Sequence, residues 1–274
     1  MTLNHQQNPD LFWAIRGGLA NFGVITELHF ELVPVSNVQA GYLTYPAEQA
    51  VEVLEVACAW AMDLPDSITS TTMVVNPPSG AFAYIGLCCS DDSLDVTDAL
   101  KPLDALGPPL RNTVKVMPAA ELGEIHLDPL APAASVSDAR LVNGPIAMHS
   151  LAPELPGQGS PLALMEFRRL GGAIARSDPH HGALDCLAGD FLLFCLGIEG
   201  ATGTRHEISA SFERVAHAMG SPGRTALNFI DDPISARSEF TPVNYRRLRK
   251  VRQVVDPTNR MRASHPIDLD PTAP

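Results

Sequence analysis

The chain contains 274 residues, 45% of them hydrophobic and 18% charged, and its formal net charge is −12. This length allows one large domain or two modest ones with a sizeable apolar core, and the negative charge opposes binding to the phosphate backbone of nucleic acids. The apolar runs are too short to span a membrane and MTLNHQQ at the start lacks a signal-peptide pattern, so we expect a soluble, cytoplasmic protein.

The amino-terminal half predicts a short helix in DLFWAIR and then a series of strands and helices. The alternation of VITELHFELVPV predicts a half-buried strand, and Pro46 is placed to begin a helix. In chain order the pattern is strand, strand, helix, strand, strand, helix, at residues 24–35, 41–45, 46–63, 69–75, 81–88 and 93–106. This order favours the α+β class, with an antiparallel sheet covered by helices on one face.

The carboxy-terminal half begins with a segment rich in Ala, Pro and Gly, residues 118–160, which predicts a loop-dominated crossover. Strands are then expected at 162–169 and 191–198, and helices at 204–219 and 243–255. The last helix has apolar anchors at Tyr245, Leu248, Val251 and Val254 or Val255. Its basic residues are predicted to form the solvated side: Arg246, Arg247, Arg249, Lys250 and Arg252.

The cysteines and histidines do not form a recognisable metal motif. The five cysteines include no CxxC, and they are interpreted as buried free thiols: Cys58, Cys88, Cys89, Cys186 and Cys195. His180 and His181 lie in a DPHHG turn, which is typical of a solvated loop. We therefore predict no metal site, and the absence of GxSxG and HExxH argues against a hydrolase or metalloprotease.

Four segments resemble landmarks of FAD-linked oxidases of the berberine-bridge-enzyme-like branch, which have a PCMH-type FAD-binding domain. They are NPDLFWAIRGG with NFGVITELHFELVPV, MEFRRLGGAIAR, TALNFIDDP and NYRRLRKVRQVVDPTNRMRASHPI, and together they cover essentially the whole chain. The resemblance implies FAD as the cofactor and oxidation of a hydroxyl, amine or C–H group of a small molecule.

The same resemblance implies a domain organisation. In the family, a segment like residues 8–26 lies late in the FAD-binding domain, after the phosphate-binding loop. The chain therefore resembles the carboxy-terminal portion of such an oxidase. Residues 1–36 would be the tail of the FAD-binding domain, 37–240 the α+β substrate domain, and 241–274 the closing helix and tail.

The resemblance also implies which residues would border the flavin. Glycines let backbone N–H groups approach a ligand closely, a role that Gly17 and Gly18 could take. The other implied flavin contacts are Asn21, Phe22, Gly23, Val24, Ile25 and Asn244. Leu19 and Ala20 stand where relatives usually have two more glycines, at positions that can require a positive φ. Alternatively, Gly17 and Gly18 only end the DLFWAIR helix.

A flavin oxidase needs a base for the substrate proton, and the predicted catalytic residues are Glu166 and Tyr245. Glu166 shares a strand face with Arg168, and the alternative is an ion pair on an exposed sheet surface. The alternative for Tyr245 is an apolar anchor of its helix. Asn228 is a weaker site candidate than either residue.

Two functions are compatible with these motifs. The first is an FAD-dependent oxidoreductase, although we do not expect this chain to be active alone. The second is a cofactor-free remnant or substrate-domain scaffold that needs a separate FAD-binding chain. The second predicts an exposed apolar surface at Phe12, Trp13 and Phe22, covered by that chain or by a homo-oligomer.

Overall fold

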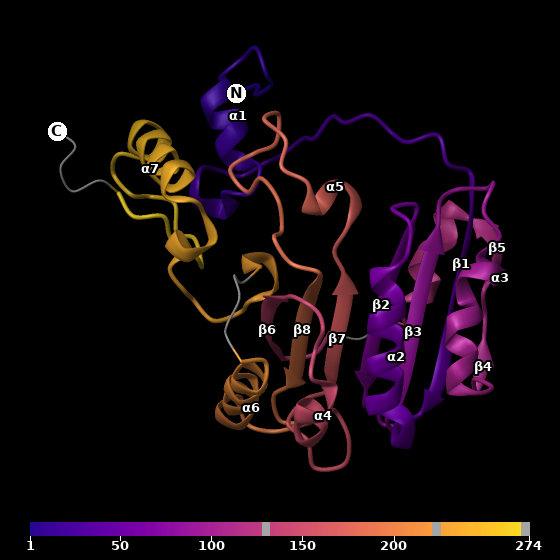
Figure 1. The fold of residues 1–274 in the computed structure, drawn as a ribbon. Helices are drawn as coiled ribbons and strands as arrows, with labels where there is room; N and C mark the ends of the chain where they lie inside the picture. The colour runs from indigo at the N-terminus through magenta and orange to yellow at the C-terminus, as the bar shows by residue number, and fades with distance from the viewer. Residues whose placement is uncertain (128–131, 221–225, 270–274) are drawn as a thin grey trace.

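The computed structural model describes residues 1–127, 132–220 and 226–269, and it is built around one antiparallel sheet (Figure 1). The strand order is β4-β1-β3-β2-β7-β8-β6, and β5 also pairs with β1. The strands are β1 Asn37–Pro46, β2 Ile68–Val75, β3 Phe82–Cys89, β4 Arg111–Asn112, β5 Lys115–Pro118, β6 Ser135–Val142, β7 Leu164–Arg169 and β8 Phe191–Ile198.

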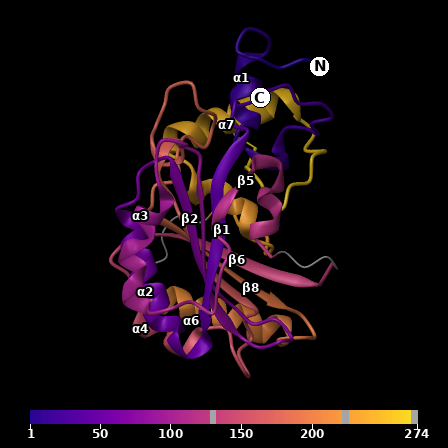
Figure 2. The same cartoon turned by 90° about the vertical axis from the view of Figure 1, so that its right-hand side faces the viewer.

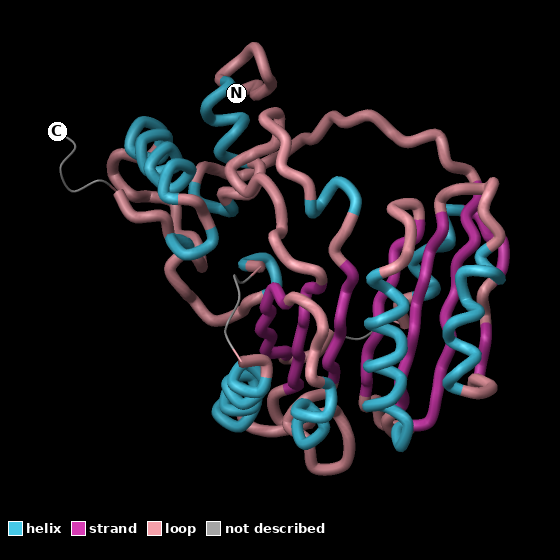
Figure 3. Tube along the Cα trace, in the orientation of Figure 1, coloured by secondary structure: helices cyan, strands magenta, loops and turns pink. Residues whose placement is uncertain are grey.

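Seven α-helices occur in the described part of the chain: α1 Pro9–Ile15, α2 Ala50–Met62, α3 Val96–Leu100, α4 Met148–Leu151, α5 Gly172–Ala175, α6 Arg205–Ala218 and α7 Pro242–Val255. Short 3-10 helices connect them: η1 Leu19–Asn21, η2 Ala47–Gln49, η3 Lys101–Leu106, η4 Ala119–Ile125, η5 Ala152–Glu154, η6 Leu227–Phe229 and η7 Ala236–Glu239. Figure 3 distinguishes the helices, in cyan, from the strands, in magenta.

One face of the sheet forms the main core. Ile85, Phe167 and Leu193 point from the strands toward α2 and α6, where they meet Leu54 and Ile208. Figure 2 shows α2, α3 and α4 together on one side of the strands. The predicted α+β class, with helices on one face of an antiparallel sheet, is therefore confirmed.

The described residues cover the opposite face of the sheet at its two ends. At the β1 end, η4 lies over Tyr42 and Tyr84, whose rings stack with centroids 5.1 Å apart. At the β6 end, Leu141 and Leu192 pack in a second core with Trp13 and with residues of α7. The middle of this face, at β2 and β7, is left for a cavity.

The ends of the described chain come together in that second core. α1 and α7 lie side by side in Figures 1 and 2 and contact each other. The guanidinium of Arg247 lies 4.1 Å from the centre of the Trp13 ring and forms an ion pair with Asp10 at 2.6 Å. Residues from opposite ends of the sequence therefore build one packed unit.

The strand predicted at 24–35 is wrong. The segment is extended but pairs with no described strand, and it runs as the long indigo trace toward β1 in Figure 1. Its side chains are exposed, with Val24 and Leu32 both at 82%. An alternating pattern marks a chain suited to a sheet, but a strand forms only where a second strand supplies hydrogen-bond partners.

The loop-dominated crossover predicted at 118–160 is wrong in part. It contains β6, which pairs with β8 along its full length, from Ser135 with Ile198 to Val142 with Phe191. SVSDARLV has too few large apolar residues to stand out among the neighbouring Ala, Pro and Gly. The stretch 128–131 of this prediction lies outside the described residues. The other predicted strands and helices are found close to their expected positions.

The side chains of α7 correct a second prediction. Arg252 does not belong to the solvated side, since it is only 3% exposed, and Arg249 is half-buried. Arg246 and Lys250 are exposed as expected.

All five cysteines are free, with Cys58, Cys89 and Cys195 buried, and burial raises the pKa of the Cys58 thiol to about 12.

The start of α6 gives a test of the fold. Thr204 accepts a hydrogen bond from the Glu207 amide, and the Glu207 carboxylate accepts one from the Thr204 amide, which forms a capping box. Thr204→Ala should lower the free energy of unfolding by about 1 kcal/mol in urea titrations. Thr204→Ser should change it little, and equal loss in both variants would contradict this role of the hydroxyl.

No described helix combines the length and apolar character that crossing a membrane requires. In the described part of the chain, no group of three or more His, Cys, Asp or Glu side chains is arranged to hold a metal ion.

Candidate functional site

A cavity of about 450 Å³ occupies the uncovered middle of the sheet. The register of β2 against β7 explains why polar side chains line the cavity. Thr71 pairs with Arg168 and Met73 with Glu166, so alternate residues of the two strands share this face. Most of the other lining side chains are apolar: Leu122, Ile125, Leu170, Ile174, Leu187, Leu192 and Phe229. The cavity therefore combines a small polar group on the sheet with apolar walls.

Glu166 is the buried carboxylate of this cavity, at 4% exposure. The Thr71 hydroxyl donates a hydrogen bond to its Oε1 at 2.6 Å, and Arg168 Nη2 lies 2.9 Å from its Oε2. One oxygen is therefore bound by a neutral donor and the other by a cation. The interpretation as an ion pair on an exposed surface does not describe Glu166, whose side chain is enclosed.

Arg168 is held in place by two aromatic rings as well as by Glu166. Its guanidinium carbon lies 5.6 Å from the centre of the Phe194 ring and 5.1 Å from that of Phe229. Guanidinium groups are attracted to the faces of aromatic rings, so this contact fixes the cation beside the carboxylate. Phe229 comes from the TALNFIDDP segment and Arg168 from MEFRRLGGAIAR, so the fold joins two of the segments noted in the sequence.

Tyr245 lies elsewhere, in the second core, and is not among the described residues that line the cavity. Its hydroxyl donates to Asp268 Oδ2 at 3.0 Å and accepts from the Asp268 amide at 3.2 Å. Burial raises the pKa of this phenol. This geometry matches the anchor interpretation, and a catalytic role for Tyr245 stays a prediction.

Gly17 and Gly18 make close contacts within the chain itself. A Cβ on Gly17, which has φ 99°, would lie 2.4 Å from the Leu184 Cβ, and one on Gly18 would lie 2.2 Å from the Ala14 carbonyl oxygen. Leu19 follows with φ 58°, so it adopts the left-handed conformation that a glycine adopts without strain. Ala20, with φ −71°, does not.

Asn21 is completely buried and forms four hydrogen bonds. Its Nδ2 donates to the carbonyls of Gly18 and His265, each at 3.0 Å. Its Oδ1 accepts from Arg252 Nη1 at 2.7 Å and from the Ile267 amide at 2.9 Å. Every polar position of the Asn21 amide is therefore used to join residues near the two ends of the chain.

The surface expected at Phe12, Trp13 and Phe22 is not the exposed apolar surface of the structure. Trp13 is 9% exposed and Phe22 7%, because α7 and the segment after it cover them, and Phe12 is half-buried. A run of exposed apolar side chains lies further along, at Val24, Ile25, Leu28, Phe30, Leu32 and Val33. The exposed apolar surface therefore lies in the amino-terminal segment, as predicted, but it is formed by residues other than Phe12, Trp13 and Phe22.

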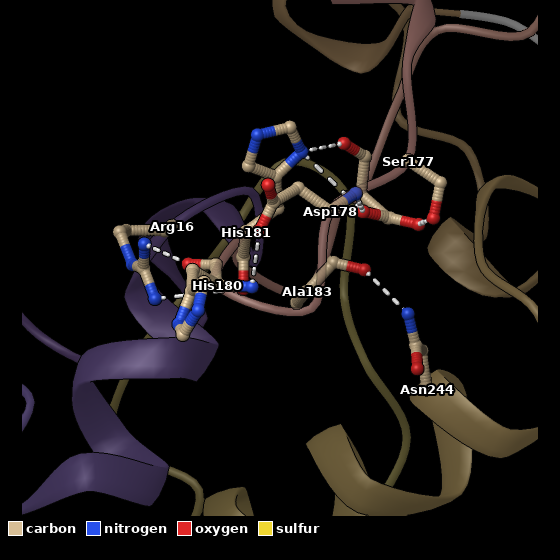
Figure 4. Close-up of polar contacts among 8 residues, drawn as sticks. Arg16, Ser177, Asp178, His180, His181, Ala183 and Asn244 are labelled. Carbon is tan, nitrogen blue, oxygen red and sulfur yellow. Dashed lines mark hydrogen bonds and ion pairs between the residues drawn. The ribbon is translucent and has the colours of Figure 1, made fainter.

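Asn244 helps to hold the loop that contains His180 and His181 (Figure 4). Its Nδ2 donates to the Ala183 carbonyl at 3.0 Å, and Arg16 Nη1 donates to the His180 carbonyl at 2.8 Å. The loop is closed from within by Asp185, whose pKa is lowered chiefly by a hydrogen bond from the Ser177 hydroxyl. The amide of Asn244 thus has a structural partner, and its contact with flavin stays a prediction.

Comparison with solved structures identifies the fold. 6-Hydroxy-D-nicotine oxidase from Arthrobacter nicotinovorans superimposes with a TM-score of 0.79 at 20% identity, over 98% of this chain and 63% of that one. The Physcomitrella patens BBE-like 1 protein gives a TM-score of 0.82 at 17% identity, with the same coverage. The chain has the fold of the berberine-bridge-enzyme-like oxidases.

Sequence comparison finds proteins named FAD-linked oxidoreductases, whereas no family model matches the chain. An FAD-linked oxidoreductase of Bacillus subtilis, YgaK, is 31% identical over 126 residues, which are 44% of this chain and 27% of YgaK. The FAD-linked oxidoreductase aurO of Gibberella zeae is 47% identical over 47 residues, 17% of this chain and 9% of aurO. The chain is thus a relative of the FAD-linked oxidoreductases, and the matched segments span about a quarter or less of these relatives.

The predicted flavin contacts differ in how well they fit such a cofactor. A Cβ added to Gly23 would meet nothing within 4 Å beyond its chain neighbours, and Val24 and Ile25 are exposed, so the backbone at 23–25 is open to a ligand. The approaches to Gly17 and Gly18 are filled by the chain itself. The backbone at 23–25 is therefore accessible and that at Gly17 and Gly18 is not, and a flavin contact at Gly23, Val24 and Ile25 stays a prediction.

Proposed function

We propose that the chain forms the substrate side of an FAD-dependent oxidoreductase that oxidises a hydroxyl or amine of a small molecule. The observation that carries this proposal is the buried Glu166 carboxylate in a 450 Å³ cavity on the open face of the sheet. Enzyme pockets of about 300–1,000 Å³ with apolar walls and a few converging polar groups are typical of small-molecule sites. The relatives' names supply the cofactor class.

Within this proposal Glu166 is the base. Its carboxylate takes the proton from the substrate hydroxyl or amine, while Thr71 and Arg168 keep its two oxygens in position. Leu192 and Phe229 exclude water from the reacting group. FAD, when bound, supplies the acceptor for the hydride from the substrate carbon, with oxygen as the final electron acceptor. Gly23, Val24 and Ile25 would border it, mainly through backbone groups.

The domain assignment belongs to the same proposal. We assign residues 1–36 and 241–274 to the flavin side and 37–240 to the substrate side. Support comes from the contact of Trp13 and Phe22 with Tyr245 and Leu248 in the second core, where Leu141 and Leu192 of the substrate side also pack.

Titration of the purified chain with FAD tests the cofactor assignment. Flavin fluorescence should be quenched in a saturable way, and Ile25→Asp should weaken binding about tenfold, equivalent to 1.4 kcal/mol. Val33→Asp is a matched control, since it adds the same charge to an exposed position on the same segment outside the predicted contacts. A folded chain that leaves flavin fluorescence unchanged at every FAD concentration would overturn binding by this chain alone.

A second candidate function is a substrate-binding scaffold that works with a separate FAD-binding chain. The exposed apolar segment favours it, because Leu28, Phe30 and Leu32 lie in solvent on an unpaired extended backbone. The wild-type chain should then bind a dye for apolar surfaces such as ANS, and the Leu28→Ser, Phe30→Ser double variant should bind much less. Equal dye binding by both proteins would contradict this role of the segment.

A further inference from the structure

The walls of the cavity point to a narrower class of substrate than the proposed function alone. We propose that the cavity, as the substrate pocket of that function, selects an uncharged alcohol carried on an aromatic or alicyclic ring, and that it rejects sugars. This inference rests on the proposed function for its chemistry but on the lining residues for its selectivity.

The first argument is the shortage of free polar groups. The Thr71 hydroxyl already donates to Glu166, and the Thr69 hydroxyl donates to the Cys88 carbonyl at 3.4 Å. Arg169 donates to backbone carbonyls on the other side of β7, including that of Ile68 at 3.0 Å. Among the described lining residues, the ionisable side chains left for a ligand are Glu166, Arg168, His126 and the weakly polar thiol of Cys88. The Ser70 hydroxyl also has no hydrogen-bond partner among the described residues, but its oxygen is buried from solvent.

These few hydrogen-bonding groups can satisfy one hydroxyl of a ligand but not several. A buried hydroxyl without a hydrogen-bond partner costs about 1–3 kcal/mol. A sugar would bury several hydroxyls against Leu170, Leu192 and Phe229, which offer none. A single hydroxyl can instead donate to a remaining lone pair of the Glu166 carboxylate while the ring occupies the apolar part of the cavity.

The second argument is charge. The Glu166 carboxylate and the Arg168 guanidinium are paired at 2.9 Å, so the polar group has no net charge when both are ionised. The other titratable side chains among the described lining residues are His126, on the exposed loop after η4, the Cys88 thiol, and Arg169, which already donates to backbone carbonyls. A charged ligand would lose its hydration here without a dedicated counter-ion, so an uncharged ligand is favoured.

The third argument is the shape of the apolar wall. Phe229 and Leu192 lie near the Glu166 and Arg168 group, whereas Ile174, on α5, is 55% exposed at the rim. An apolar ring suits this wall better than a polar one, and aromatic pairs, for which Phe229 is the available partner, add about 0.5–1.5 kcal/mol beyond the area that they bury.

Saturation-transfer NMR on the purified chain without FAD tests the inference, with 2-naphthalenemethanol and glucose as probes. We expect transfer to 2-naphthalenemethanol and none to glucose. Ile174→Glu should weaken binding at least tenfold because it places a charge at the apolar rim. Leu110→Glu is the matched control: this side chain is also exposed, at 69%, and lies outside the cavity. Circular dichroism checks that both variants are folded.

Glucose binding equal to or tighter than that of 2-naphthalenemethanol would overturn the inference. So would 2-naphthalenemethanol binding that is the same in wild type, Ile174→Glu and a second cavity variant, Phe229→Ala. Because these measurements contain no flavin, they are independent of the FAD titration. If the chain binds FAD but not 2-naphthalenemethanol, the substrate class is rejected and the proposed function stands. If it binds 2-naphthalenemethanol but not FAD, the substrate class stands and FAD binding by this chain alone is rejected.

Discussion

Glu166→Gln is expected to lower the rate constant for reduction of bound flavin by an alcohol by about 10²–10⁴-fold, which is the usual contribution of a positioned general base. Glutamine has nearly the same shape as glutamate, but its amide cannot accept the substrate proton. The measurement is the rate of loss of visible flavin absorbance when the FAD-loaded chain is mixed with 2-naphthalenemethanol without oxygen.

Two comparisons separate a base from a residue that only shapes the cavity. Glu124→Gln makes the same chemical change on η4, at an exposed position outside this cavity, and should leave the rate unchanged. Binding of 2-naphthalenemethanol to Glu166→Gln should weaken far less than the rate falls, since the hydroxyl can still meet an amide. Flavin reduction at the wild-type rate in the glutamine variant would exclude Glu166 as the base.

Arg252→Met is expected to cause the largest loss of stability, about 3–5 kcal/mol, because it leaves buried acceptors without donors. Arg252 Nη1 donates to Asn21 Oδ1 at 2.7 Å and to the Ile267 carbonyl, and Nη2 donates to Asn259 Oδ1 at 2.6 Å. These bonds join the segment around Asn21 to the end of the described chain. The free energy of unfolding from urea titrations is the measurement.

The matched control is Arg246→Met, which makes the same substitution on the same helix at an exposed position and should change stability by no more than about 0.5 kcal/mol. A double-mutant cycle of Arg252→Met with Asn21→Ala should show a coupling of about 0.5–3 kcal/mol. If Arg252→Met were as mild as Arg246→Met, the buried hydrogen bonds would not be what holds the two segments together.

The site was accessible to sequence reasoning only in part. Glu166 and Arg168 were correctly placed on one strand face, because a period of two fixes which residues point the same way. Thr71 and Phe229 were missed as their partners. They lie on other segments, and no local pattern shows that β2 pairs with β7 or that η6 reaches the sheet.

The sequence by itself determined the elements that depend on local order: the helix expected at 204–219, the strand FLLFCLGI and the α+β class. Only the tertiary structure decided how each face is used. It left VITELHFELVPV without a partner strand and buried Arg252 within a helix face that looked solvated. The physical reason is that periodicity records which residues share a side, whereas burial depends on what packs against that side. For Arg252 those neighbours come from both ends of the chain, at Asn21 and at Asn259 and Ile267.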